Sequence, residues 1–189
     1  LTNEAVTFTV PERHYHRMER NGIEAIVVDN HAGDISKLSQ HRAGYNGLAY
    51  LGHIDQQQNV FVPFYAGLNF EHIHDGDSRR LVEKFEPRKS PMELRVVDEY
   101  TVELYQPPTA NFQLESCGRY QLLPDGTVEY TFECIPRGDT FTRGFIGLFW
   151  ASYINQPADK AIYIRGRLAA NRDDKTRWMA ARAWRCAAP

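Results

Sequence analysis

The sequence predicts an all-β fold, an antiparallel β-sandwich, and three observations support this prediction. Short apolar runs recur along the chain between turn residues, with 13 glycines and 10 prolines spread over 189 residues. One Asn-Gly pair and one Pro-Asp-Gly triplet each separate two strand-like runs, which is typical of antiparallel hairpins. Helical periodicity is scarce before residue 166. Many short strands with turns at this spacing favour a sandwich over a helical or parallel fold.

Composition places the chain among globular proteins with a sizeable core. Hydrophobic residues make up 42% of the chain and aromatic residues 12%, which is too apolar for a disordered protein. The formal net charge of -2 argues against a nucleic-acid partner, because such proteins usually carry a basic excess. No apolar run approaches the roughly 20 residues of a membrane span, so we expect no membrane partner.

The first hairpin is centred on Asn21-Gly22, which joins two strand-like runs. An Asn-Gly pair tolerates positive φ at both turn positions. In the resulting register His14 faces Asp29, and we expect a hydrogen bond that satisfies an exposed imidazole. Beyond loops rich in glycine, the next strand candidates are runs bounded by turn residues: 60–64, 69–75, 92–97, 101–105 and 161–165.

A second hairpin turns at Pro124-Asp125-Gly126. This triplet fits a type I turn followed by a left-handed glycine, which makes a three-residue loop with a bulge. The bulged register pairs Leu123 with Thr127 and leaves one face apolar and the other charged. A two-residue turn would mix the two kinds of side chain, so the bulged register is favoured.

The last third of the chain combines an apolar strand with a basic, alanine-rich tail. Run 145–154 is apolar on both faces and predicts a central strand that is covered on both sides. Run 172–185 carries apolar residues at helical spacing and predicts one short C-terminal helix. We therefore expect a sandwich domain over 1–166 and a separate, helical tail over 167–189.

Three cysteines, Cys117, Cys134 and Cys186, contain no C-x-x-C pair and predict neither a disulfide scaffold nor a thiolate zinc site. Free thiols slightly favour a reducing, cytoplasmic location. The bulged register sends Cys117 and Cys134 to opposite faces, so we expect no bridge between them. We expect Cys134 to be a buried thiol.

The densest group of polar candidates lies in the strand run 69–75. Alternation along a strand sends His72 and His74 to one face and Glu71 to the other. Two imidazoles on one strand face can bind a divalent transition metal, as in cupin-type sites. The glutamate that a cupin places after its second histidine is missing here. The alternative is a polar histidine pair that bonds to neighbouring carboxylates.

Two further polar groups leave alternatives open. The glycine-bearing loop 41–47 holds His41, Arg42 and Tyr45, and such loops either line ligand clefts or only turn the chain. It lacks the spacing of a phosphate-binding loop. On the second hairpin, the charged face carries Arg119 between carboxylates. Acid–base work on a sugar is one interpretation, and cross-strand ion pairing is favoured over it.

Three runs, 59–76, 86–95 and 147–154, together resemble a group of poorly characterised bacterial proteins near the galactose-mutarotase-like β-sandwiches. The resemblance covers roughly residues 20 to 166. It implies carbohydrate work on a broad sheet face, because that superfamily includes aldose epimerases and sugar-binding domains. Two features depart from it: the late catalytic His and Glu of mutarotases have no match, and the chain is shorter than a complete sandwich of this type. A member of the group with these departures would be truncated or divergent, with a reduced site.

The function that we predict from the sequence is a carbohydrate-binding or carbohydrate-processing sandwich, resembling aldose epimerases, with a small-molecule or oligosaccharide ligand. Arg42 and Asn69 would hold hydroxyl groups, and Tyr45 would stack on a sugar face. His72 with Glu71 would supply acid–base groups if a bulge brings them to one face. The alternatives are a metal-dependent, cupin-like enzyme and a non-catalytic interaction domain. The predicted cleft consists of His41, Arg42, Tyr45, Asn69, Glu71 and His72, and the predicted metal ligands are His72 and His74.

Overall fold

The computed structural model describes residues 5–35, 37–56, 58–159, 161–166 and 177–182 of the chain. The described residues are mostly strand, and their α-helix, α1 (Glu86–Lys89), has a single turn, so the all-β prediction is confirmed. Contacts divide the chain into two compact units, Leu1–Asn155 and Gln156–Pro189. This boundary lies earlier than the expected one after residue 166. None of the described helices is long and apolar enough to cross a membrane.

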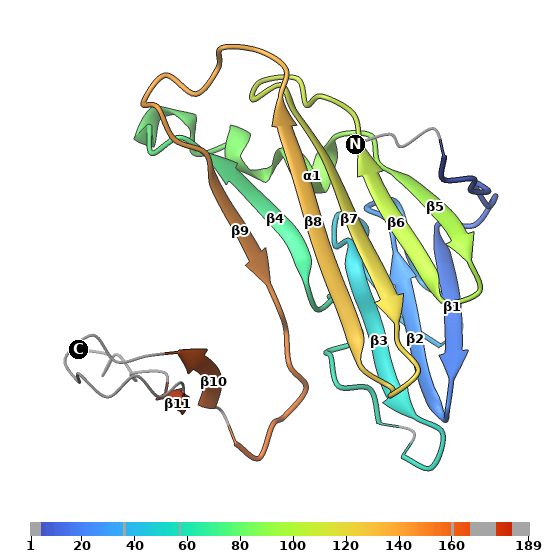
Figure 1. The fold of residues 1–189 in the computed structure, drawn as a ribbon. Coiled ribbons are helices and arrows are strands. Elements are labelled where there is room, and N and C mark those ends of the chain that lie inside the picture. The colour runs from blue at the N-terminus through green and yellow to red at the C-terminus, as the bar shows by residue number, and fades with distance from the viewer. Residues whose placement is uncertain (1–4, 36, 57, 160, 167–176, 183–189) are drawn as a thin grey trace. The chain divides into compact units, whose positions relative to one another are not determined.

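Three strands of the first unit form one antiparallel sheet in the order β1-β2-β3 (Figure 1). The first hairpin has the predicted register, because Asn21 and Gly22 take positive φ angles of 49° and 80°. The close turn aligns the two strands residue by residue. The sheet consists of β1 (Tyr15–Arg20), β2 (Ile23–Val28) and β3 (Gly47–His53).

Four consecutive strands form a second antiparallel sheet, β5-β6-β7-β8. Its last hairpin is the bulged one: Gly126 has a φ of 83°, and the Leu123 N–H donates to the Thr127 carbonyl at 2.8 Å. The register pairs Leu122 with Val128, as the segregation of apolar from charged residues predicts. The sheet consists of β5 (Glu93–Asp98), β6 (Thr101–Gln106), β7 (Leu114–Leu122) and β8 (Val128–Pro136).

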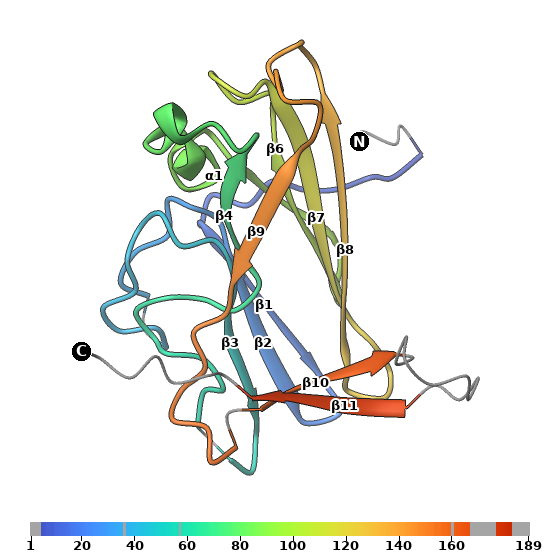
Figure 2. The ribbon, with the colours of Figure 1, turned by 90° about the vertical axis from the view of Figure 1, so that its left-hand side faces the viewer.

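The β1–β3 and β5–β8 sheets share one apolar core (Figures 1 and 2). Met18 and Val27 from the first sheet pack with Val102, Tyr120 and Leu122 from the second, and all five side chains are almost fully buried. Inward-facing apolar residues alternate with polar ones along β6 and β7, as two packed sheets require, whereas β2 and β3 are apolar and buried on both faces. This arrangement fits the predicted all-β class, and the galactose-mutarotase type stays a prediction.

A third, two-stranded sheet pairs β4 (Asn69–His74) with β9 (Gly147–Ala151). The prediction that run 145–154 is a central, doubly covered strand is wrong. Among the described residues β9 pairs only with β4, and Phe149 is 47% exposed. Apolar residues on both faces of a run do not show which strands or sheets will lie beside it. An edge strand can also carry aromatic side chains on its outer face.

The connection from β4 to β5 contains three short helical turns, η1 (Ser78–Arg80), η2 (Glu83–Phe85) and α1. Pro87 lies in the first turn of α1, where its missing N–H costs no hydrogen bond. This connection matters for function because it presents Phe85, Arg88 and Lys89 beside β4.

The second unit contains a hairpin of β10 (Ala161–Gly166) and β11 (Arg177–Arg182). The predicted helix over 172–185 is therefore wrong for residues 177–182, and its remaining residues lie outside the described part. Backbone pairing with β10 outweighs the local helix propensity of the alanines, which is a weak preference.

The two cysteines of the described part are free, as expected, but Cys134 is not the buried thiol that the sequence predicts. Cys117 is 7% exposed and Cys134 is half-buried. Cys117 pairs with Tyr105 on the charged face, and there the Arg95 guanidinium lies over the rings of Tyr105 and Phe8. Long charged side chains cover apolar surface in this way with their stems and planar groups.

Candidate functional site

A β-bulge in β4 brings the two predicted catalytic groups together. The pairing with β9 shifts between Phe70 and His72, which leaves Glu71 as the extra residue. Without a bulge, Glu71 and His72 would point to opposite faces. In the structure the His72 Nε2 lies 3.7 Å from a Glu71 carboxylate oxygen. The bulge therefore brings Glu71 and His72 close together, as a joint role of these two side chains would require.

The buried carboxylate of Glu71 is held by two donors from distant parts of the chain. Arg88 Nη1 and the Tyr153 hydroxyl both lie 3.3 Å from Glu71 Oε1. Burial and the nearby Glu71 carboxylate raise the pKa of Tyr153 to about 12, so this tyrosine stays a neutral donor at neutral pH. These two donors hold the carboxylate in one orientation. They also link β4 to α1 and to the segment after β9.

Arg88 is positioned by contacts on three sides. Its Nε donates to the Gly44 carbonyl at 3.0 Å, and its guanidinium carbon lies 4.0 Å from the centre of the Tyr45 ring. Glu71 supplies the third contact. A planar guanidinium stacked on an aromatic face loses little further freedom when it binds a ligand. Arg88 is therefore prepared to hold an anionic or hydroxyl-bearing group.

Three tyrosines form a cluster next to Arg88. The Tyr45 ring centre lies 4.7 Å from that of Tyr65 and 5.8 Å from that of Tyr153, and the last two are 4.5 Å apart. Arg42, which is exposed, lies over Tyr65 at 5.6 Å. The structure thus brings the predicted Arg42 and Tyr45 into one aromatic group with Arg88.

Helix α1 is fixed by buried polar side chains on neighbouring segments. The Asn30 amide donates to the carbonyls of Pro87 at 3.0 Å and Ser90 at 2.7 Å. On the other side, the Glu86 carboxylate accepts from the Phe112 N–H at 3.0 Å. The Asn30 bonds satisfy carbonyls of α1 and of the residue after it, and the Glu86 bond ties the first residue of this very short helix to Phe112. They hold Arg88 and Lys89 in place.

A pocket of about 500 Å³ opens beside α1. Its basic and titratable wall is formed by Arg88, Lys89 and His31, and no carboxylate side chain lines it. The Lys89 side chain is exposed and has no hydrogen bond or ion pair within the described part of the chain. Phe85 adds an apolar surface. The side chains and backbone that line the pocket include Asn30, His31, Gly44, Phe85, Arg88 and Lys89.

Two predicted ligand contacts have scaffolding roles instead. The ring nitrogens of His41 lie 3.1 Å from the carbonyl oxygens of Pro63 and Tyr45, so this buried histidine ties two loops together. Asn69 is fully buried, and its side-chain oxygen accepts from the Asn46 N–H at 3.2 Å. Neither side chain lines the pocket. A strand pattern in the sequence does not show whether a polar side chain such as Asn69 faces solvent or a buried backbone group.

The predicted metal pair is not completed by a third ligand. The ring of His72 packs between Phe85 at 4.5 Å and Phe149 at 5.1 Å, and burial lowers its pKa although Glu71 opposes the shift. His74 is exposed and lies near Phe145. Within the described ranges, no other His, Cys, Asp or Glu joins this pair in a group of metal-binding geometry.

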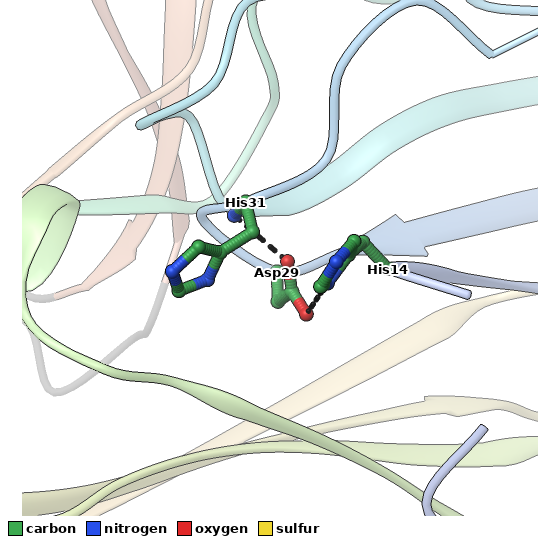
Figure 3. A group of neighbouring side chains, drawn as sticks. All are labelled: His14, Asp29 and His31. Atoms are coloured by element: carbon green, nitrogen blue, oxygen red, sulfur yellow. Dashed lines mark hydrogen bonds and ion pairs between the residues drawn. The ribbon is translucent and has the colours of Figure 1, made fainter. Parts of the chain in front are cut away.

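A different group has that geometry: His14, Asp29 and His31 (Figure 3). The predicted bond between His14 and Asp29 is confirmed, with Nδ1 and Oδ2 3.0 Å apart. The His31 N–H donates to the other carboxylate oxygen at 2.8 Å, and one ligand atom from each of the three side chains lies within 4.8 Å of the others. Sequence reasoning missed His31. The sequence contains one signal for it: His31 lies two residues after Asp29, which is expected to face His14.

Comparisons with protein family models, with curated proteins and with solved structures find no match for this chain. The resemblance to galactose-mutarotase-like sandwiches therefore stays a prediction.

Proposed function

We propose that this protein binds a small carbohydrate that carries an acidic group, in the pocket beside α1. The observation that carries the proposal is the pocket wall, in which Arg88 and Lys89 occur without any carboxylate. Guanidinium and ammonium groups recognise carboxylates and phosphates through charge-assisted hydrogen bonds. Phe85 provides the apolar platform that sugar sites combine with directed polar groups.

The position of Glu71 and His72 supports binding rather than acid–base catalysis. Neither residue lines the pocket. The carboxylate of Glu71 is already occupied by Arg88 and Tyr153, which suits a positioning residue that holds the guanidinium. A general acid or base must reach the proton that it transfers, and these two side chains contact Arg88 and Phe85 without lining the pocket themselves.

Calorimetric titration of the full chain tests the proposal. D-Galacturonate and D-glucuronate should bind, and the neutral sugars D-galactose and D-glucose should bind at least about tenfold more weakly, because one charge-assisted hydrogen bond contributes about 1.5–3 kcal/mol. Lys89→Gln should weaken uronate binding by a similar factor. The matched control is Arg143→Gln, which removes an exposed cation outside the pocket.

Three results would contradict the proposal. One is the absence of uronate binding up to millimolar concentration. Another is equal affinity for the acidic and neutral sugars. The third is a Lys89→Gln variant that binds uronates as tightly as the Arg143→Gln control does.

A further inference from the structure

We infer that His14, Asp29 and His31 bind one divalent transition-metal ion at the edge of the pocket. The three residues come from separate places: His14 directly precedes β1, Asp29 directly follows β2, and His31 lies in the loop beyond. The first hairpin brings His14 opposite Asp29, and Figure 3 shows His31 on the other side of the same carboxylate. The convergence therefore follows from the fold of the first sheet.

The distances suit a metal ion after a small adjustment. Ligand atoms about 2.0–2.1 Å from a tetrahedral zinc ion lie roughly 3.3 Å from one another. His14 Nδ1 and Asp29 Oδ2 are 3.0 Å apart, and the ligand atoms of the whole group lie within 4.8 Å. His31 is exposed, so its ring can rotate toward the ion without displacing core residues.

The carboxylate is oriented before any ion arrives. The Asp29 side chain is 5% exposed, and its Oδ1 accepts the N–H of His31 at 2.8 Å. Such a hydrogen bond fixes the direction of a metal-binding carboxylate and preserves the second oxygen for the ion. The side chain of His14 is 58% exposed, so the group is open to ions in solution.

Two imidazoles and one carboxylate select the kind of ion. Nitrogen donors favour zinc and other late transition metals over magnesium and calcium, which prefer oxygen ligands alone. Three protein ligands leave at least one coordination position free, as in metal sites that also bind a small molecule. His31 lines the pocket as well, so the ion would lie at its edge. The inference does not depend on the sugar proposal, because it uses only the three side chains.

The test uses untagged full-length protein without any sugar. Cobalt(II) is titrated by visible absorption and zinc(II) by calorimetry, and the wild type should bind one ion of each per chain. The variants His14→Ala, His31→Ala and Asp29→Asn should each weaken zinc binding by at least about tenfold. The control is His53→Ala: His53 is a half-buried histidine 3.6 Å from the Asp55 carboxylate, no third ligand joins the two within the described residues, and its loss should leave zinc affinity unchanged.

Several outcomes would overturn the inference. Weak zinc binding without a defined stoichiometry would leave only a hydrogen bond between His14 and Asp29. So would unchanged affinity in both His14→Ala and His31→Ala, or an equal loss in His53→Ala. If Asp29→Asn fails to fold, the two histidine variants decide the question alone, because both replace exposed side chains.

Discussion

Replacement of Glu86 by alanine should lower the free energy of unfolding by about 3–5 kcal/mol. The Glu86 carboxylate is buried and accepts the N–H groups of Asn111 at 2.7 Å and Phe112 at 3.0 Å, besides the Asn111 side-chain amide at 2.7 Å. Hydrogen bonds to a charged group contribute about 1.5–3 kcal/mol each. Asn111 is exposed, so water can replace part of the hydrogen bonding that it loses in the variant. Phe112 is fully buried, and its N–H would stay unpaired, which costs about 1–3 kcal/mol.

Urea unfolding followed by circular dichroism measures this loss. The matched control is Glu129→Ala, which removes an exposed glutamate from β8 and should cost less than about 0.5 kcal/mol. A loss below about 1 kcal/mol for Glu86→Ala, or a loss equal to that of the control, would refute the view that this carboxylate anchors α1 to the following loop.

Three further predictions follow from burial and backbone geometry. Burial lowers the pKa of His72 below that of a free histidine, so between these two values the unfolded chain binds a proton that the folded chain does not. Stability should therefore fall as the pH drops from about 7 to about 5, and His72→Phe should reduce that fall in urea titrations. Burial raises the pKa of Cys117 to about 12, so iodoacetamide at about pH 8 should leave this thiol unmodified. The half-buried Cys134 should react before it does, and peptide mass spectra measure both. Gly47 has a φ of 107°, and an added Cβ would lie 2.7 Å from a backbone carbonyl oxygen, so Gly47→Ala should lower the melting temperature. The control Gly33→Ala should leave the melting temperature unchanged, because the nearest atom to its added Cβ lies 3.8 Å away.

The parts of the fold that depend on local turn chemistry could be predicted from the sequence. Asn21-Gly22 and Gly126 set the registers of two hairpins because the permitted φ angles of a turn determine which residues face each other. Burial depends on distant segments, and there the predictions of a doubly covered strand over 145–154 and of a buried Cys134 are wrong. Apolar content does not show which sheet will cover a strand, and a charged face can be covered by arginine side chains.

The candidate site could be predicted only in part, for a related reason. The sequence pointed to Glu71, His72 and Tyr45, but a strand pattern cannot show the bulge that brings the first two together. It gave no role to Arg88 or His31, because their partners lie on other elements and become neighbours only in the folded chain.

The most direct test of the proposed site is to locate an acidic sugar on the protein. Amide chemical shifts of isotope-labelled protein are recorded while D-galacturonate is added. Acidic-sugar binding in the pocket should give saturable shifts centred on Gly44, Phe85 and Lys89, and these shifts should be lost in Lys89→Gln. Shifts centred on the exposed face of β9, or no saturable shifts at all, would contradict it.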